Sequence, residues 1–232
     1  MIQLSLRAVA ARYLAGCVAV LFLALSAWSQ NGQAALPAIT FSLDFPQSLP
    51  DHYVMTLSSD GRATYESSGK MTADSDAEEP FHYDFTVSPA TRDKMFALAA
   101  KAKYFEGKLD SGKHNIASTG TKVLTYKDSQ RRNQASYNYS PMTAVQELTA
   151  LFQNISATLE FGRRLDYYHH YQKLALEEEL KRMEEMMIEK SLDEIQAIAP
   201  ILHQIAADSS VINVSRARAQ RLLNGNGAMA TR

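Results

Sequence analysis

The stretch HYVMTLSSDGRATYES, residues 52–67, decides the fold of this chain. Two runs rich in β-forming residues lie on either side of the pair Asp60-Gly61. Glycine accepts the positive φ angle that a tight turn needs, so an Asp-Gly pair between two such runs predicts a β-hairpin. We therefore expect a fold built on antiparallel strands.

Similar strand signals lie on both sides of this hairpin. Residues 39–45, ITFSLDF, alternate apolar and polar side chains, which is the pattern of a strand with one buried face. Residues 81–87, FHYDFTV, repeat that pattern with aromatic side chains. Residues 121–127 and 135–139, joined by a turn at 128–130, predict a further hairpin.

Two helices are predicted by matching start signals, Ser88-Pro89 and Ser140-Pro141. In each pair the serine can cap free backbone amides, and the proline suits the first helical position. Apolar residues then recur every three or four positions, which predicts one buried face on each helix. An unbroken helix over residues 141–190 would be about 75 Å long. We therefore expect a kink or a stop near Gly162.

Further helices are expected beyond Gly162. The first of them carries a second apolar stripe, formed by Leu176, Leu180, Met183 and Met187. Residues 191–194, SLDE, have the pattern of a capping box and predict the start of the next helix, which Pro200 should bend. The last helix is expected over residues 211–223.

These elements predict an α+β fold, in which antiparallel β-hairpins pack with two helices and a long-helix and helical-hairpin C-terminal extension follows. The α+β domain is expected over residues 38–161 and the helical extension over 163–223. Residues 1–29 are expected to be a signal peptide, and residues 224–232 a disordered tail.

The first 29 residues predict export. They contain two arginines and no acid, and an apolar run at residues 13–28 ends in small residues before Gln30. The run is shorter than the roughly 20 apolar residues that span a bilayer. This favours a cleaved signal and a periplasmic or secreted protein. Leu14–Cys17 also fits the motif of lipoprotein signals, so anchoring through a lipidated Cys17 is the alternative.

Charge and cysteine content narrow the classes of partner. The chain has 24 Lys and Arg residues against 25 Asp and Glu, a formal net charge of −1 at pH 7. This balance gives no electrostatic attraction to nucleic acid, so we expect no nucleic-acid partner. Cys17 is the only cysteine and leaves with the signal. We expect the exported chain to be held by its hydrophobic core without a disulfide.

The segments FSLDFPQSLPDHY, YESSGK, SPATRDKMF, YNYSP and LEFGRRLDYYHHYQKLALEEELKRM extend over most of the exported chain. Together, residues 39 to about 223 resemble an uncharacterised family of secreted bacterial proteins. This resemblance implies export and an intact domain, and it implies no catalytic residue. Residues 200–223 separately resemble one HEAT-type repeat. Because a solenoid needs three or more repeats, we expect only a helical hairpin there.

Two groups of residues are candidates for a metal site. Asp74, Asp76 and Glu78 alternate like the start of a calcium loop, but the glycine and the bidentate glutamate of such a loop are missing. Asp166 and His170 lie one helical turn apart, whereas zinc needs three or four ligands. We therefore expect solvated polar faces, with no metal and no cofactor.

The stretch RRLDYYHHY, residues 163–171, places three tyrosines on one helix. The rings cover a wide arc, which suits packing against protein with the hydroxyl groups left in water. With the apolar stripe that follows, they predict a surface that protein covers, either by docking onto the chain's own domain or by association with a partner or a second copy. The expected interaction residues are Tyr167, Tyr168, Tyr171, Leu176, Leu180, Met183 and Met187.

The sequence shows no catalytic constellation, since the exported chain lacks cysteine and a Gly-x-Ser-x-Gly elbow. The first hypothesis is an exported non-enzymatic protein that binds a partner protein, or itself, through its C-terminal helices. A hydrolase or metal-dependent enzyme is the alternative. A pocket that joins two or more of the following four residues would favour it: His52, His82, Asp84 and His114. A small-ligand carrier that uses a cleft between helices and sheet is the third hypothesis.

Overall fold

The first hairpin consists of strands β2 (His52–Ser58) and β3 (Arg62–Ser68), as predicted. The structure is a computed structural model that describes residues 36–46, 48–71, 80–113 and 115–229. Gly61 has a φ of 91°, and the Asp60 carboxylate accepts a hydrogen bond from the Arg62 amide at 3.1 Å. The Asp-Gly pair therefore makes the turn for which glycine is needed.

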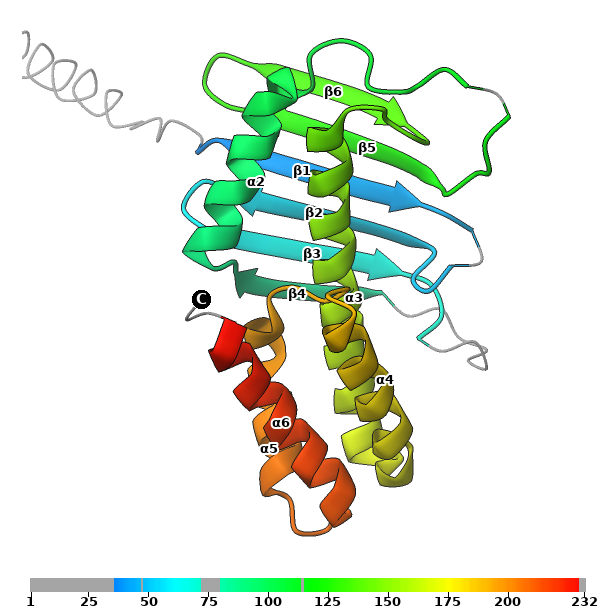
Figure 1. The fold of residues 1–232 in the computed structure, drawn as a ribbon, viewed down its shortest axis with the longest axis vertical. Helices are drawn as coiled ribbons and strands as arrows, with labels where there is room; N and C mark the ends of the chain where they lie inside the picture. Colours follow the sequence, from blue (N-terminus) through cyan, green and yellow to red (C-terminus); the bar gives the residue numbers. More distant parts are fainter. Residues whose placement is uncertain (1–35, 47, 72–79, 114, 230–232) are drawn as a thin grey trace, which may run out of the picture. The chain divides into compact units, whose positions relative to one another are not determined.

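Six antiparallel strands form one sheet in the order β4-β3-β2-β1-β5-β6 (Figure 1). The other four strands are β1 (Ala38–Asp44), β4 (Phe81–Thr86), β5 (Thr121–Lys127) and β6 (Arg132–Tyr137). β1 is central because it pairs with both β2 and β5, placing Phe41 opposite Met55 and Leu124. β4 is consequently an edge strand, and it lies beside the C-terminal helices (Figure 1).

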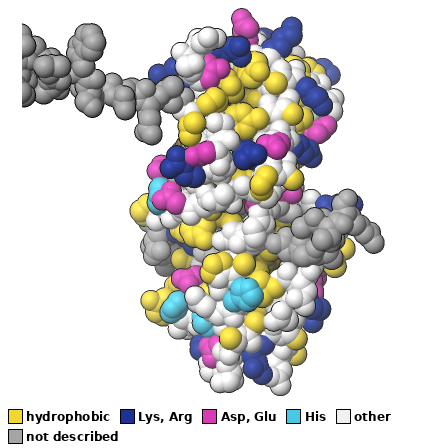
Figure 2. Space-filling view, turned by 90° about the vertical axis from the view of Figure 1, so that its left-hand side faces the viewer, with side chains coloured by type: hydrophobic (Ala, Val, Ile, Leu, Met, Phe, Trp, Pro, Cys, Tyr) yellow, Lys and Arg dark blue, Asp and Glu magenta, His cyan; other side chains and the backbone are white. Residues whose placement is uncertain are grey.

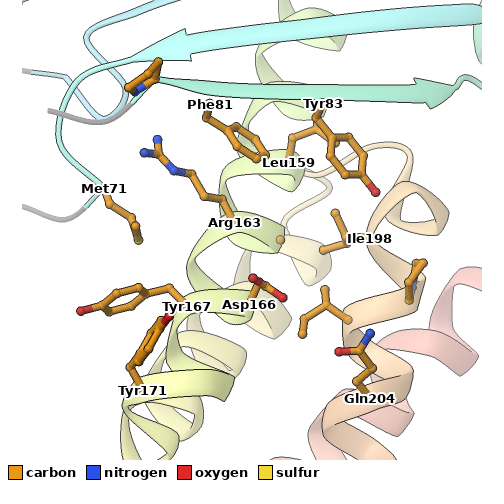
Figure 3. Close-up of a pocket in the computed structure, with 14 residues that line it drawn as sticks. Met71, Phe81, Tyr83, Leu159, Arg163, Asp166, Tyr167, Tyr171, Ile198 and Gln204 are labelled. Carbon is orange, nitrogen blue, oxygen red and sulfur yellow. The ribbon is translucent and has the colours of Figure 1, made fainter.

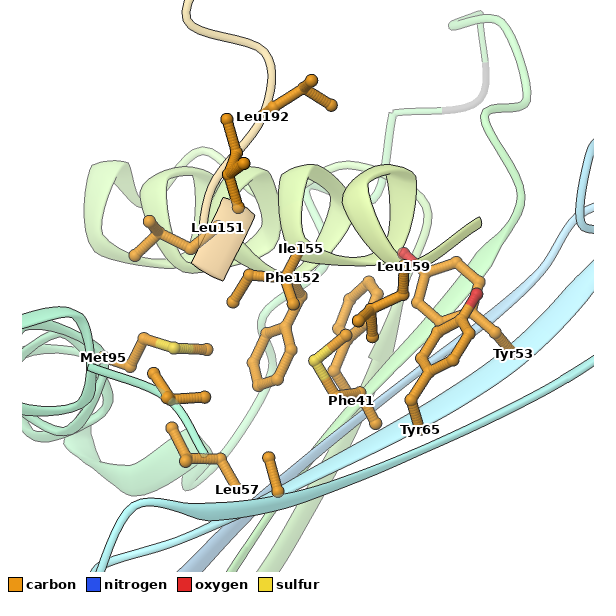
Figure 4. Packing of buried hydrophobic residues seen from close by; sticks show 14 of the residues in the cluster. Phe41, Tyr53, Leu57, Tyr65, Met95, Leu151, Phe152, Ile155, Leu159 and Leu192 are labelled. Carbon is orange, nitrogen blue, oxygen red and sulfur yellow. The ribbon is translucent and has the colours of Figure 1, made fainter. Parts of the chain in front are cut away.

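Helices α2 (Pro89–Lys101) and α3 (Thr143–Tyr171) cover one face of the sheet. Figure 4 shows Phe152, Ile155 and Leu159 of α3 directed at the strands. Phe152 stacks on Phe41 with 5.0 Å between ring centroids, and both rings are fully buried. Burial of such rings is the main stabilising contribution of this layer. The predicted α+β fold is confirmed.

The two serine-proline signals behave differently. Ser88 caps α2 as predicted, because its hydroxyl accepts a hydrogen bond from the Thr91 amide at 3.4 Å. The prediction that the second helix begins at Ser140-Pro141 is wrong by a short distance, since α3 begins at Thr143. The Ser140 hydroxyl instead accepts a hydrogen bond from the Met142 amide at 3.3 Å, within the preceding turn.

The break expected near Gly162 is also wrong, because α3 runs through this glycine to Tyr171. A Cβ atom at position 162 would lie 2.5 Å from Ile198 Cγ2. The glycine therefore allows a later segment of the chain to approach α3 closely, and it does not end the helix. The helix ends at Tyr171, with Gln172 as its C-cap, and the short 3-10 helix η3 (Lys173–Ala175) follows.

Helix α4 (Leu176–Ile188) runs back alongside α3 (Figure 1). The capping box expected at residues 191–194 does not form. Glu194 has a φ of 59°, and its carboxylate accepts hydrogen bonds from the Ser88 amide and hydroxyl, both at 2.8 Å. Glu194 thus binds the start of α2, where a helix N-terminus favours negative charge.

The predicted helical hairpin consists of α5 (Ala199–Ala207) and α6 (Asn213–Met229), preceded by the 3-10 helix η4 (Ile195–Ile198). Pro200 lies in the first turn of α5, where it does not bend the helix. Helix α6 continues past residue 223, the expected end of the helical extension. Within the described part of the chain, no helix has the length and apolarity to cross a membrane.

Candidate binding cleft

A buried carboxylate fixes α3 to the sheet at the point where the helix passes the edge strand. Glu160 is 3% exposed and accepts hydrogen bonds from the Tyr65 hydroxyl at 2.9 Å and the Ser67 hydroxyl at 2.6 Å. Arg163 lies one turn further along α3, with its Nη1 3.7 Å from Glu160 Oε2. Burial, followed by the nearby Glu160 charge, raises the pKa of Tyr65 well above its ordinary value. Tyr65 therefore stays a neutral donor.

Beyond this point, a cleft of about 450 Å³ opens between β4, α3 and α5 (Figure 3). This volume lies in the range typical of ligand pockets, roughly 300–1,000 Å³. Leu159, Gly162 and Asp166 of α3 line it, while Ile198, Ile201 and Gln204 lie on the side of α5. Met71 and Pro80, which come before β4, complete the lining. The close approach at Gly162 brings the two helical walls together.

Four aromatic rings line the cleft in two pairs. Phe81 and Tyr83 of β4 stack with centroids 6.0 Å apart, and Tyr167 and Tyr171 of α3 lie 5.1 Å apart. The Tyr83 hydroxyl donates a hydrogen bond to the Ala197 carbonyl at 2.8 Å, which fixes that ring. Tyr171 is 75% exposed and therefore stands at the opening of the cleft.

Asp166 and His170 do lie together, as predicted, but only as a pair. The His170 Nδ1 atom is 3.7 Å from Asp166 Oδ1, and both side chains are more than half exposed. Among the residues that the structure describes, no group of three or more His, Cys, Asp and Glu side chains could hold a metal ion. The other candidate ligands, Asp74, Asp76 and Glu78, lie outside the described residues.

The predicted interaction surface is divided by the structure. Leu176, Leu180 and Met183 are fully buried, since α4 packs against both α3 and α6. They are therefore not accessible to a partner, which corrects their assignment to an interaction surface. Met187 is partly buried and lies near Gly225 of α6.

The tyrosines lie on different sides of α3. Tyr167 and Tyr171 line the cleft, whereas Tyr168 lines a smaller cavity of about 280 Å³ with Phe161, Met186 and others. Arg164 and Glu179 also line this second cavity, where Arg164 Nε lies 2.6 Å from Glu179 Oε1. Tyr167 and Tyr168 are both partly buried, so the exposed ring of the three is Tyr171, on the cleft side.

The end of α3 is held by a polar cluster around Asp208. Its carboxylate lies 2.7 Å from Lys173 Nζ and 3.0 Å from His169 Nε2. The Lys173 hydrogen bond, followed by those from Ser210, lowers the pKa of Asp208 well below its usual value. These contacts join α3 to the turn between α5 and α6 and so keep the cleft's walls in place.

The face of the sheet opposite α2 and α3 carries the histidines that sequence analysis considered for catalysis. A hollow of about 420 Å³ has both His52 and His82 in its lining. His82 lies between two carboxylates, with its Nδ1 3.4 Å from Glu66 Oε1 and its Nε2 3.3 Å from Asp84 Oδ1. The hollow thus joins two of the four residues, His52 and His82, and Asp84 contacts His82 beside it, while His114 lies outside the described residues.

Sequence analysis missed the contribution of the edge strand to the cleft. Phe81 and Tyr83 were expected on a buried strand face, yet both are only partly buried. The signal was present in the aromatic residues at each inward position of FHYDFTV. Periodicity does not give the order of strands in the sheet, so it could not show that these rings lie at an edge.

The comparisons with known proteins assign no family to the chain. No family model matches it, and no curated protein is significantly similar to it. The resemblance to an uncharacterised secreted family therefore stays a prediction. Function must therefore be inferred from the geometry and chemistry of the cleft itself.

Proposed function

We propose that this chain is an exported, non-enzymatic interaction module that binds a partner protein through the cleft between α3, β4 and α5. The observation that supports it most strongly is the exposed Tyr171 ring, with the partly buried Tyr167 ring next to it, beside a cavity of about 450 Å³. Aromatic side chains that flank a pocket are typical anchors at protein interfaces, where tyrosine is enriched. The proposal includes export, which follows from the sequence of residues 1–29.

The proposed binding surface is the cleft, and not the apolar stripe of α4 that the sequence suggested. Leu176, Leu180 and Met183 pack inside the chain, so no partner is needed to cover them. Tyr171 has no such cover, and its neighbour Tyr167 is only partly buried. A partner that covered both rings would remove apolar surface from water, at about 25 cal/mol per Å².

The surface charge supports a protein partner better than a polyanion. On the face shown in Figure 2, basic and acidic side chains are interspersed. Nucleic-acid binding generally uses a basic patch or stripe. An interaction through a defined cleft is therefore a better explanation than long-range attraction.

Site-specific photo-crosslinking tests the proposal. A photoreactive phenylalanine analogue replaces Tyr171 in the full chain, which is then expressed and irradiated in its own host. The matched control replaces Tyr139, which is 44% exposed and is not part of the cleft lining. We expect a crosslinked product of defined mass from position 171 that position 139 does not give. A product of twice the chain's mass would identify a second copy as the partner, and equal products from both positions would contradict the proposal.

Hydrolysis at the open sheet face is a second candidate function. It is favoured by the hollow that joins His52 and His82, and by the two carboxylates beside His82. A histidine oriented by a carboxylate is a common general base. The test is a panel of chromogenic ester, peptide and glycoside substrates. Turnover by the wild type that His82→Ala abolishes would support this candidate, and turnover unaffected by the substitution would reject it.

A further inference from the structure

The cleft contains two charged side chains, and only one of them is accessible. Arg163 and Asp166 both line it. The Arg163 side chain is 7% exposed, with its guanidinium carbon 5.2 Å from the centroid of the Phe81 ring and its Nη1 3.7 Å from Glu160. The positive charge is therefore already balanced by a buried carboxylate. Asp166, with a side chain that is 62% exposed, is the charge that a ligand would meet.

His170, one turn further along α3, lies closer to the backbone of Asp166 than to its carboxylate. The His170 Nδ1 atom lies 2.8 Å from the Asp166 carbonyl oxygen and 3.7 Å from its carboxylate. The ring is therefore held mainly against the backbone. Since no other lysine or arginine besides Arg163 lines the cleft, the accessible part of this described pocket carries a net negative charge.

The aromatic rings that line the cleft near this carboxylate also favour a positively charged ligand. Figure 3 shows Asp166 between Tyr167 and Tyr171 on one side and Gln204 and Ile198 on the other, with Phe81 and Tyr83 nearby. The face of an aromatic ring carries partial negative charge and attracts cations. Because the Arg163 guanidinium already lies over the Phe81 ring, the part of the cleft that suits a cation and disfavours an anion is Asp166 with Tyr167 and Tyr171.

We infer that the cleft accepts a cationic group, the guanidinium or ammonium of an arginine or lysine side chain on the partner polypeptide, with Asp166 as its counter-ion. This inference rests on the proposed function and adds the chemistry of recognition. The aliphatic part of such a side chain packs against the apolar lining, including Ile198 and Ile201. The cleft holds one long side chain, and the exposed Tyr171 contacts the residues that flank it.

The inference is tested by titration of the full chain with peptides, followed through the ring resonances of isotopically labelled tyrosine. The probe is the capped peptide Gly-Ser-Arg-Ser-Gly. Its matched controls carry citrulline, which has the shape of arginine without the charge, or glutamate at the central position. A capped single arginine distinguishes a partner polypeptide from a small free cation.

We expect the arginine peptide to shift the resonances of Tyr83, Tyr167 and Tyr171 and to leave Tyr139 unchanged. It should bind roughly tenfold or more tightly than the citrulline peptide, as a charge-assisted contact implies. Asp166→Asn should remove that difference. The control Asp44→Asn changes an aspartate of similar exposure, 64%, on the sheet and should preserve it.

Equal binding of the arginine and citrulline peptides, or a preference for glutamate, would overturn the inference, as would an Asp166→Asn variant that binds like the wild type. If capped arginine binds as tightly as the peptide, the cationic group need not belong to a polypeptide. That result would overturn this part of the inference and favour a small free cation as the ligand. Absence of any shift would overturn cation recognition. In that case the crosslink from position 171 still decides the proposed function separately.

Discussion

The two halves of α3 have the same helical period but different neighbours. The sheet half, residues 143–159, faces a continuous sheet and buries Val145, Leu148, Phe152 and Ile155 completely. The cleft half, residues 160–171, passes the edge strand and meets separate helices, which leave a cavity and an exposed Tyr171. This difference shows that a continuous sheet can cover one face of a helix completely. Individual helices cover such a face only at the points where they approach it closely. We therefore expect the largest losses of stability from substitutions in the sheet half, and binding at the opening of the cleft half.

The largest expected effect is in the sheet half. Phe152→Ala removes a fully buried ring that stacks on Phe41 at 5.0 Å. The free energy of unfolding should fall by about 4 kcal/mol, through lost burial and the cavity that remains. Denaturant unfolding followed by circular dichroism measures it. A loss below about 1 kcal/mol would show that the core is not centred on this contact.

Substitution of Glu160, at the junction of the two halves of α3, should lower the free energy of unfolding almost as much. Glu160→Ala leaves the buried hydroxyl groups of Tyr65 and Ser67 without their acceptor, and it removes the carboxylate beside Arg163. The free energy of unfolding should fall by about 3 kcal/mol. Glu160→Gln keeps an acceptor and should cost clearly less in the same denaturant experiment. Equal losses for both variants would show that the hydrogen bonds are not what stabilises the junction.

Gly162 offers a sharper test of the cleft half. In Gly162→Ala the new Cβ would lie 2.5 Å from Ile198 Cγ2, so the segment before α5 must shift. We expect a loss of about 1–2 kcal/mol, because overpacking outweighs the better helix propensity of alanine. In an Ile198→Ala background the same substitution should stabilise the chain. A double-mutant cycle measures this reversal, and additive effects would exclude the clash.

Acid should loosen α4 and α6, the pair of helices beyond the sheet, before it loosens the sheet half of α3. Arg221 and Arg218 lower the pKa of Glu184 and thereby hold α6 against α4. A lowered carboxyl pKa stabilises the folded chain above the unfolded value, about 4.3, and this contribution disappears as the pH falls through the folded pKa. Partly exposed pairs contribute up to about 1 kcal/mol.

Hydrogen exchange measured from pH 7 to pH 3, corrected for intrinsic rates, tests this prediction. Protection of α4 and α6 should fall below about pH 4, while the amides of residues 143–159 keep theirs. In Glu184→Gln the acid-dependent change should be smaller. If residues 143–159 lose protection at the same pH as α4 and α6, the two parts of the chain do not differ in stability, and the prediction is wrong.

The smallest effect on stability is expected at the opening of the cleft. Tyr171 is 75% exposed, so Tyr171→Ala should change the free energy of unfolding by less than about 0.5 kcal/mol. The same substitution should weaken binding of the arginine peptide. Thermal unfolding and the peptide titration, measured on one preparation, provide both values. A large loss of stability would show that the ring belongs to the fold and not to the site.

The sequence predicts the sheet half better than the cleft half for physical reasons. Alternation and the Asp60-Gly61 turn are local, so they predicted the strands and the hairpin correctly. The predictions of a helix break at Gly162 and of a capping box ending at Glu194 were wrong because the residues that these two contact are remote in the sequence. Gly162 lies against Ile198, and Glu194 binds Ser88 at the start of α2. The cleft depends on β4 being an edge strand, and strand order is a property of the whole fold. The three tyrosines of RRLDYYHHY lie in and beside this region, but the sequence could not show which of them is exposed.

The most direct test of the account compares tyrosine labelling of the full chain in purified form and inside its host. Nitration followed by mass spectrometry reads Tyr167 and Tyr171, with Tyr139 as the exposed control and Tyr65 as the buried one. The account predicts that Tyr171 is modified in the purified chain and protected in the host, while Tyr139 is modified in both. Equal modification of Tyr171 in both settings, or protection in the purified chain, would contradict the claim that a partner protein binds at the opening of the cleft and covers Tyr171.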